Sequence, residues 1–566
     1  MEQSAQNAAQ AGIGALRKAG VTAVFGNPGT TELPLMQALS GQPEMHYYLG
    51  LQEGVSVGMA AGYAAASGKP GVVMLHAVPG VSNGLSHYYN AFRNGLPVLM
   101  ISGQSDRAHQ YLSPMLYGNL ETATAAYSKW TWEARTAEEI PVVMVRAFSE
   151  AAAAPSGPTF LSLPLDLQLQ PVESSDGHVF AQPRLGAAAA SDIAECAHLL
   201  RRATNPAIVA GDLIGRNRCE ADLVQLATNA GCAVYWEPMS LFANFPADNP
   251  AFQGVLFPSG EDFRRVFRDH DVVLWCGSDL RAPLLYDGTL WHDASTDVIV
   301  LSDRTAGISD GFAPALLLVG DPAATLQEIG GELGLAGFDA DAAHVRERRE
   351  RLANAAAARR AKITAAAQKR AAQVPLAPVS VIDEILTALP RNAIVVDDAV
   401  SNSGWVSMCG QYGDAISYLG PSKGGGIGFG LPVALGAKVA QPERPVVAFL
   451  GDGAAMYSIQ GLWSAAHHDL PVVFVILNNS SYRILKGGIL TMFGDTHDAD
   501  ALATVPGFDL NTPAIDFVAL ARSCGVAARR IDSPGQCADA MREALASGKP
   551  YLLDIGVERD VRKVLR

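Results

Sequence analysis

Short runs of valine, isoleucine and leucine recur along the chain and alternate with longer, alanine-rich stretches. The runs are almost wholly apolar, as in strands that are buried on both faces of a parallel sheet. The alanine-rich stretches are long enough to form helices that cover such a sheet. The clearest runs are 23–25, 71–75, 97–101, 207–210, 272–276, 298–301, 394–396, 446–450, 472–477 and 551–555. The pattern predicts an α/β fold of doubly wound parallel sheets, repeated about three times.

Two changes in composition divide the 566 residues into three blocks. Residues 172–192 are polar and then small, whereas residues 340–376 are rich in alanine, arginine and lysine. Because the second stretch has few large apolar residues, we expect a solvated helix on the surface; a basic helix that binds nucleic acid is the alternative. The predicted domains are 1–175, 190–340 and 375–566, and the first and third are similar in length and rhythm.

Composition and charge narrow the class of protein. Hydrophobic residues make up 49% of the chain and charged residues 17%, which is typical of folded domains. A formal net charge of −14 predicts no overall attraction to nucleic acid or to an anionic membrane. No apolar run reaches the roughly 18 residues of a membrane span, and no leader peptide is evident, so we expect a cytoplasmic protein. Seven cysteines without a CxxC pair suggest neither disulfides nor a zinc site.

The most specific chemical signal lies in the third block, where two apolar runs end in polar turns. One run leads into a Gly-Asp-Gly turn centred on Asp452, and the next leads into the asparagine pair 478–479. The spacing fits a strand, a crossover helix over 458–468 and the neighbouring parallel strand, so both turns should emerge at one edge of the sheet. Carboxylate, carboxamide and carbonyl oxygens suit Mg²⁺ shared with a diphosphate. The sequence therefore predicts a site for a metal and a diphosphate.

This unit resembles the cofactor signature of the thiamine-diphosphate (ThDP) enzymes, and the resemblance extends over essentially the whole chain. It is greatest toward the benzoylformate decarboxylases of the acetolactate synthase-like superfamily. The other segments that carry it are VFGNPGT at 24–30, LQE at 51–53, LH at 75–76 and SKGGGIG at 422–428. The resemblance implies pyrimidine-binding, middle and diphosphate-binding domains, with ThDP and Mg²⁺ as cofactors. It also implies a homodimer at least, and commonly a homotetramer.

The resemblance assigns the cofactor site of the third block residue by residue. The metal ligands would be Asp452, Asn479 and the carbonyl of Ser481. The Gly425 carbonyl would bind the 4′-amino group of the cofactor, and Ile427 would be the wedge under its bend. The remaining cofactor-binding positions would be Ser401, Gly451, Gly453, Ala454 and Tyr482. The alternatives are a helix N-cap for Asp452, a turn residue for Asn479 and a flexible loop for the glycine-rich segment.

Glu53 in the first block opens an alanine- and glycine-rich helix. Taken alone, it is a favourable first-turn charge. The resemblance assigns it the hydrogen bond to N1′ of the aminopyrimidine ring, on a cofactor held by the third domain of another subunit. A carboxyl group in apolar surroundings makes such a bond strong. The smallest active unit would then be a dimer.

Other residues bear on the reaction that this cofactor serves. His76 follows an apolar run and precedes a Pro-Gly turn, so it should lie at the carboxyl end of a strand. The resemblance makes His76 a proton donor to the substrate and gives Thr30 a hydrogen bond to the substrate carboxylate. A structural histidine and a turn hydroxyl are the alternatives. Ile484 and Leu485 match positions that line the substrate cavity, and isoleucine should narrow it.

One position departs from the pattern of the decarboxylases. Their second catalytic histidine aligns with Leu284, and a leucine there would slow product release and favour carboligation. Three histidines are candidates to replace it: His87, His109 and His292. Three cations are candidates for binding a second substrate carboxylate: Arg281, Arg483 and Lys486. A solvated surface position is the alternative for each of them.

The preferred function is decarboxylation of an apolar or aromatic 2-oxo acid to an aldehyde and CO₂, with a small-molecule substrate and no nucleic-acid or membrane partner. The alternative is a carboligase or lyase similar to acetolactate synthase; His76 opposes it and Leu284 favours it. A nucleotide-binding oxidoreductase is excluded because no GxGxxG precedes an acidic residue by about 20 positions. A non-catalytic binding protein would lack Glu53 or the metal ligands.

Overall fold

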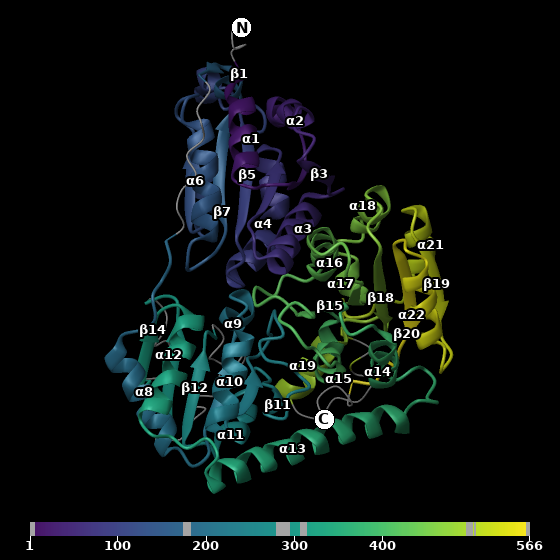
Figure 1. Cartoon of the computed structure of the whole chain (residues 1–566). Coiled ribbons are helices and arrows are strands. Elements are labelled where there is room, and N and C mark those ends of the chain that lie inside the picture. The colour runs from purple at the N-terminus through teal and green to yellow at the C-terminus, as the bar shows by residue number, and fades with distance from the viewer. Residues whose placement is uncertain are drawn as a thin grey trace.

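Three parallel sheets of six strands each form the centres of three domains in this computed structural model of the chain (Figure 1). The described residues are 6–173, 183–278, 295–305, 314–493, 502 and 505–561. All strand pairs within the three sheets are parallel, and helices flank the sheets. The prediction of a repeated, doubly wound α/β fold is therefore confirmed.

The N-terminal sheet has the strand order β3-β2-β4-β5-β7-β6. Its strands are β2 (Ala23–Asn27), β3 (His46–Leu49), β4 (Gly71–Leu75), β5 (Val98–Gln104), β6 (Trp130–Glu133) and β7 (Thr159–Pro164). Its helices are α1 (Ala8–Lys18), α2 (Leu33–Ser40), α3 (Glu53–Ser67), α4 (Ala77–Arg93), α5 (Leu120–Ala125), α6 (Ile140–Ala152) and α7 (Leu165–Leu169). The two 3₁₀ turns are η1 (Thr30–Glu32) and η2 (Arg107–Leu112), and β1 (Gln6–Asn7) pairs with β8 (Pro171–Val172).

The middle sheet has the different order β11-β10-β9-β12-β13-β14. Its strands are β9 (Ala207–Ala210), β10 (Ala233–Trp236), β11 (Phe252–Val255), β12 (Val272–Cys276), β13 (Asp297–Ser302) and β14 (Leu316–Val319). Its helices are α8 (Ala190–Arg202), α9 (Asp212–Arg216), α10 (Glu220–Ala230), α11 (Gly260–Phe267) and α12 (Pro322–Leu335).

The C-terminal sheet repeats the order of the N-terminal one, as β16-β15-β17-β18-β20-β19. Its strands are β15 (Ile394–Asp398), β16 (Tyr418–Leu419), β17 (Val446–Gly451), β18 (Val472–Asn478), β19 (Ala527–Ile531) and β20 (Tyr551–Gly556). Its helices are α14 (Pro378–Ala388), α15 (Ser403–Cys409), α16 (Gly430–Ala440), α17 (Asp452–Ala455), α18 (Gly461–His467), α19 (Arg483–Phe493), α21 (Phe517–Ser523) and α22 (Cys537–Ala546), with the turn η3 (Val400–Asn402).

A single long helix, α13 (Ala343–Lys369), links the middle and C-terminal domains and runs beneath both (Figure 1). Most of its residues are exposed or half-buried, as predicted for a solvated surface helix. Its arginines bond to the protein itself, because Arg348 donates to carbonyls of the middle domain and Arg360 donates to the Cys409 carbonyl of the C-terminal domain. These bonds give two of its basic residues a structural role, which is to hold the helix against both domains.

The N- and C-terminal domains meet where α3 packs against α16. Glycines allow the two helix backbones to touch, since a Cβ atom at Gly62 or Gly436 would overlap backbone of the other helix. One apolar cluster continues from Val55 and Val57 of α3 into Leu431 and Leu435 of α16. The carboxyl ends of two sheets are thereby held in a fixed relation.

Two further sequence expectations concern cysteines and membranes. The seven cysteines are all free, and six of them are buried. Burial raises the pKa of the six buried thiols, for example to about 12 for Cys196, so these six are unreactive core residues. Among the described residues, no helix is both long enough and apolar enough to cross a membrane.

Candidate active site

The C-terminal half of the site lies where β17 and β18 end side by side. Gly451, the last residue of β17, is in register with Leu477 of β18, and the two strands are parallel. Asp452 begins α17 directly after β17, and Asn479 directly follows β18. The Gly-Asp-Gly turn and the asparagine pair therefore emerge at one sheet edge.

Asp452 is the group that most clearly calls for a cation. It is buried, and its Oδ1 accepts a hydrogen bond from the N–H of Gly453 at 2.9 Å, whereas Oδ2 is buried without a hydrogen-bond partner. Burial raises the pKa of this carboxyl to about 6, although the hydrogen bond from the Gly453 N–H acts against the increase. A carboxylate oxygen left in this state is costly unless a metal or proton binds it.

Asn479 and Ser481 complete the oxygen-rich corner. The Asn479 side-chain oxygen accepts from the N–H of Ser481 at 2.9 Å, and both residues are buried. Arg559 donates to the backbone carbonyls of Asn479 and Ser480, which fixes the turn. Gly453 lies so close to the Tyr482 ring that a Cβ atom there would overlap it. The donor set of a carboxylate, a carboxamide and a carbonyl fits Mg²⁺, so the residues present suit the metal that the resemblance implies.

The glycine-rich segment before α16 is held against the end of β15. Asp398 is buried, and its Oδ2 accepts from the N–H groups of Gly428 at 2.9 Å and Gly430 at 3.0 Å. Burial raises the pKa of Asp398 to about 7. Gly425 has a φ of +73°, a left-handed conformation that favours glycine. The backbone of this segment is thus fixed, and a simple flexible loop does not describe it.

Ile427 and Ile484 line a cavity of about 350 Å³. The lining is mainly apolar and includes Leu256 and Phe257 of the middle domain. Leu485, the next residue of α19, is exposed and is not part of the lining. The cavity therefore lies between the middle and C-terminal domains beside the glycine-rich segment.

Several polar candidates near this cavity have structural partners. Ser403 donates to the buried Asp397, whereas Ser401 lies half-buried in the turn η3. Arg483 donates to the Asp560 carbonyl, and Lys486 pairs with Asp509 at 2.7 Å. Both cations are therefore engaged elsewhere and do not indicate a second carboxylate on the substrate.

The N-terminal half of the site is centred on His76, which follows β4 and caps α4. Its Nδ1 lies 2.9 Å from Oε2 of the fully buried Glu32 and 3.2 Å from the Thr31 hydroxyl. Glu32 is itself held by the N–H groups of Gly103 and Gly29. Because a carboxylate only accepts hydrogen bonds, it draws the ring proton to Nδ1 and leaves Nε2 for the site.

Glu53 begins α3, and its Oε2 accepts from the Asn83 side chain of α4 at 3.1 Å. Thr30 is exposed in the turn η1, next to the Thr31 that contacts the histidine. Among the described residues, no hydrogen bond or ion pair joins Glu53 or His76 to the metal-ligand candidates. Each domain presents its own half of the site.

The remaining sequence candidates lie apart from this arrangement. His109 is exposed in η2, and His87 is buried in α4, where it bonds to backbone. Arg281, Leu284 and His292 lie outside the described residues. Glu32 was not among the residues identified from the sequence. The signal that could have identified it is an acidic residue in the turn at 28–32, which lies between two apolar stretches.

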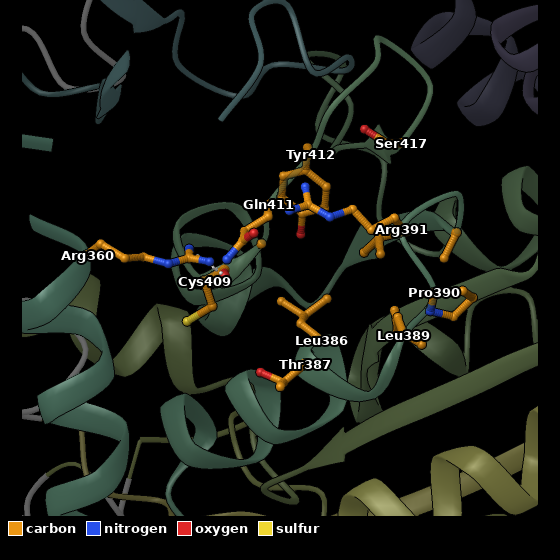
Figure 2. Close-up of a pocket in the computed structure, with 13 residues that line it drawn as sticks. Arg360, Leu386, Thr387, Leu389, Pro390, Arg391, Cys409, Gln411, Tyr412 and Ser417 are labelled. Carbon is orange, nitrogen blue, oxygen red and sulfur yellow. Dashed lines mark hydrogen bonds between the residues drawn. The ribbon is translucent and has the colours of Figure 1, made fainter. Parts of the chain in front are cut away.

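A second cavity, of about 230 Å³, lies at the opposite end of the C-terminal sheet (Figure 2). It includes Ala393, just before β15, and it contains none of the predicted site residues. Arg360 and Arg391 point toward one another across Gln411 (Figure 2). Arg391 also pairs with Asp248 at 3.1 Å. This cavity is separate from the edge where Asp452 and Asn479 emerge.

Three domain models of one enzyme family match successive parts of the chain. Residues 6–125, 193–329 and 398–555 match the N-terminal, central and C-terminal domain models of thiamine pyrophosphate enzymes. Benzoylformate decarboxylase from Pseudomonas aeruginosa is 33% identical over 95% of this chain and 97% of its own. Acetolactate synthase from Bacillus subtilis is 25% identical over 96% of this chain and 92% of its own.

A solved structure agrees with these sequence relatives. The thiamine diphosphate-dependent 4-hydroxybenzoylformate decarboxylase of Rhodococcus jostii has a TM-score of 0.86 at 27% identity, covering 98% of this chain and 100% of its own. The predicted fold class of three parallel-sheet α/β domains agrees with the three domain models. On the family models, the relatives and the fold together, the chain belongs to the thiamine-pyrophosphate-dependent enzymes.

Proposed function

We propose that the protein is a ThDP- and Mg²⁺-dependent decarboxylase that converts an apolar or aromatic 2-oxo acid to an aldehyde and CO₂. The observation that carries the proposal is the pairing of His76 with the buried Glu32 at 2.9 Å. A ring fixed in this way offers Nε2 for proton transfer at the substrate's keto oxygen. The relatives named benzoylformate and 4-hydroxybenzoylformate decarboxylase support the same reaction class.

The cofactor would be held by the C-terminal domain. Asp452, Asn479 and the Ser481 carbonyl would bind the metal, and the N–H groups at Gly451 and Gly453 would approach the diphosphate. The Gly425 carbonyl would accept a hydrogen bond from the aminopyrimidine, and Ile427 would support the bend of the molecule. Bound ThDP supplies a carbon nucleophile and an electron sink for cleaving the bond next to a keto group.

The chain's own residues would position the substrate and move protons. Glu53 would hydrogen-bond the aminopyrimidine ring, and His76 would exchange a proton with the substrate oxygen. The apolar lining around Ile427 and Ile484 excludes water and favours an apolar substituent. Thr30 would contact the substrate carboxylate from the turn η1.

We propose further that each active site combines two chains. Glu53 and His76 of one subunit would face the metal and cofactor of the partner's C-terminal domain. The absence of a direct bond between the two halves within the described part of one chain is consistent with this arrangement. A homodimer would be the smallest active unit, and a homotetramer would be a pair of such dimers.

A carboligase or lyase is the second candidate function. Leu284 favours it, because a leucine cannot donate the proton that the second histidine of the decarboxylases supplies. The similarity to acetolactate synthase favours it as well. Free aldehyde as the product supports the decarboxylase, and acyloin as the product supports the carboligase.

The experiment that tests the proposal offers benzoylformate, pyruvate and a branched 2-oxo acid in turn, with ThDP and Mg²⁺. CO₂ release and product identity are measured for wild type and for Glu53→Gln. We expect free aldehyde, with the aromatic acid preferred, and loss of turnover in the variant. Acyloin without aldehyde would overturn the proposal in favour of the carboligase, and no turnover of any 2-oxo acid would contradict both.

A further inference from the structure

A stripe of polar residues runs along one face of α4 and on to its C-terminal cap. Its members are Asn83, His87, Asn90 and Asn94. Successive members are three or four positions apart, so they lie on the same side of the helix. Three of them are buried, and buried polar groups need partners. The partners of the stripe are the two segments that carry Glu53 and Ile427.

The first two members of the stripe hold the start of α3. Asn83 donates to the Glu53 carboxylate at 3.1 Å. One turn later, the His87 Nδ1 lies 2.7 Å from the carbonyl of Gly54. The orientation of Glu53 therefore depends on α4 through its side chain and through the backbone of the residue that follows it.

The last two members hold the glycine-rich segment 422–427. Asn90 bonds Gly426 twice, donating to its carbonyl at 2.7 Å and accepting from its N–H at 3.1 Å. Asn94 donates to the Ser422 hydroxyl at 3.0 Å and accepts from the N–H of Lys423 at 3.2 Å. The pairing leaves no room for a Cβ atom at Gly426, where the Ser86 hydroxyl would lie 2.8 Å away.

His87 touches both segments at once. Besides its bond to the Gly54 carbonyl, its ring packs 5.3 Å from the ring of Phe429, two residues after Ile427. A neutral imidazole has one N–H donor, which the Gly54 carbonyl accepts, so the ring holds the start of α3 by a hydrogen bond and the end of the glycine-rich segment by ring packing. It is 5% exposed, and burial lowers its pKa, which keeps it neutral.

The ends of the glycine-rich segment are anchored by other elements. The Lys423 ammonium lies 2.6 Å from both Asp212 and Glu237 of the middle domain. At the other end, Asp398 binds Gly428 and Gly430. Between these anchors, Asn90 and His87 supply the contacts to the stretch that carries Ile427.

We propose that the polar stripe of α4 is a positioning element that couples the Glu53 carboxylate to the Ile427 wedge, with His87 as its central residue. The inference rests on the proposed function. In a dimer of that kind, Glu53 and Ile427 of one chain serve different cofactors, so the stripe connects two active sites. His87 touches neither substrate nor cofactor in this proposal and acts through the Gly54 carbonyl and the Phe429 ring that it contacts.

The test compares variants of the full chain, first without cofactor. His87→Phe keeps a buried ring beside Phe429 but removes the hydrogen bond to the Gly54 carbonyl, and His87→Asn keeps an amide nitrogen near the position of Nδ1. Tyr89→Phe is the matched control, because it removes a half-buried hydroxyl elsewhere on the same helix. Hydrogen exchange is followed in peptides covering 50–58 and 420–430, with 207–236 of the middle domain as an internal reference.

We expect His87→Phe to increase exchange in both site peptides but not in the reference, and His87→Asn to restore protection in 50–58. With cofactor added, ThDP should bind roughly tenfold more weakly to His87→Phe. The kcat for the 2-oxo acid should fall by a similar factor with KM nearly unchanged. Exchange and ThDP affinity like those of Tyr89→Phe would overturn the proposal.

Two outcomes are separated by design. If wild type binds ThDP but turns over no 2-oxo acid, the proposed function fails, and the exchange and affinity measurements still decide the role of the stripe. If His87→Phe does not fold, Asn90→Asp carries the test, because it loses the donor to Gly426 while keeping its size. Unchanged exchange in 420–430 of that variant would then count against the stripe.

Discussion

The N- and C-terminal sheets share one strand order but carry different chemistry at matching places. The residue directly after the third strand of the sheet is His76 in the first domain and Asp452 in the last. His76 faces a buried carboxylate, whereas the Asp452 Oδ2 has no hydrogen-bond partner. The first arrangement is complete within the protein and suits proton transfer, while in the proposed function a cation would complete the second. One frame thus provides two complementary halves of a site.

The match extends to the ends of the first strands. Asn27 ends β2 and donates to the carbonyl of Gly50, just before α3. Asp398 ends β15 and accepts from Gly428 and Gly430, just before α16. In each domain a polar side chain on the first strand holds the backbone that leads into the helix at the domain interface. The two side chains differ because Asp398 carries an ionisable carboxyl group, whereas Asn27 carries an amide that stays neutral.

The largest effect is expected when the two halves of the site are inactivated on different chains of a dimer. Under the proposed function, Glu53→Gln and Asp452→Ala should each lower activity by a factor on the order of 10² or more, since one would remove the carboxyl acid and the other a metal ligand. A hybrid dimer with one chain of each kind has one intact site if sites form between chains. Differently tagged chains, co-expressed and purified together, should recover about half of the wild-type kcat.

A second hybrid dimer serves as the matched control, and it is expected to be inactive. A wild-type chain paired with a chain carrying both substitutions has no intact site if each site combines two chains, so this hybrid should be inactive. An active hybrid of that second kind, together with an inactive one of the first kind, would show that each chain holds a complete site.

The second prediction concerns Asp398, the residue at the end of β15, where β2 of the N-terminal sheet ends in Asn27. Asp398→Asn gives β15 the residue that ends β2, and its amide oxygen can still accept from Gly428 and Gly430. The folded protein holds the Asp398 proton up to a pKa of about 7, well above its unfolded value. The unfolded chain therefore releases the proton first, and wild type loses stability as the pH rises from about 4 to about 7.

Asp398→Asn has no such loss of stability. The free energy of unfolding of this variant, relative to that of wild type, should therefore increase as the pH rises from about 4 to about 7. A shift of this size in the Asp398 pKa corresponds to at most about 4 kcal/mol in the free energy of unfolding. The nearby carboxyl of Asp397 shares part of this energy, because the two groups titrate together. Urea unfolding of the cofactor-free proteins at pH 5 and pH 8 measures the difference. A gap between variant and wild type that is equal at both pH values would contradict a buried, neutral carboxyl.

A smaller effect should follow from Glu32→Gln in the N-terminal domain. The substitution keeps the shape but replaces the charged acceptor of His76 with a neutral amide, which holds the ring less firmly. Losing a hydrogen bond to a charged group costs about 2 kcal/mol, so kcat should fall by roughly 10- to 100-fold. Thr31→Val removes the weaker 3.2 Å contact and should cost less. Equal effects of the two substitutions on kcat would show that the carboxylate does not orient the ring.

The sequence was sufficient for features that depend on neighbouring residues. Apolar runs of the right length predicted the strands, and the turns at Asp452 and Asn479 followed because parallel strands end at one edge. The surface position of α13 followed from its composition. These features are local, or are linked by a single crossover, so spacing along the chain determines them.

Partners that are distant in sequence were not predictable in this way. Glu32 and His76 are 44 positions apart, and Asn90 and Gly426 are 336 apart. Each pairing depends on how strands order in a sheet or how two domains dock, which no local pattern encodes. His87 shows the limit well: the sequence offered it as a proton donor, whereas the structure buries it between two backbone segments.

The smallest effect should come from a substitution in the apolar cavity beside Ile427. The residues that line this cavity do not transfer protons, in contrast to His76 in the N-terminal half of the site. Ile484 lines this cavity and Leu485 does not, so the neighbouring pair provides its own control. Ile484→Ala should raise kcat/KM for a para-substituted benzoylformate relative to benzoylformate by roughly tenfold, since contacts of a few methylene groups are worth about 1–2 kcal/mol. Leu485→Ala should leave the ratio unchanged. If Leu485→Ala shifts the ratio instead, the substrate enters from the exposed face of α19 rather than through the cavity beside Ile427.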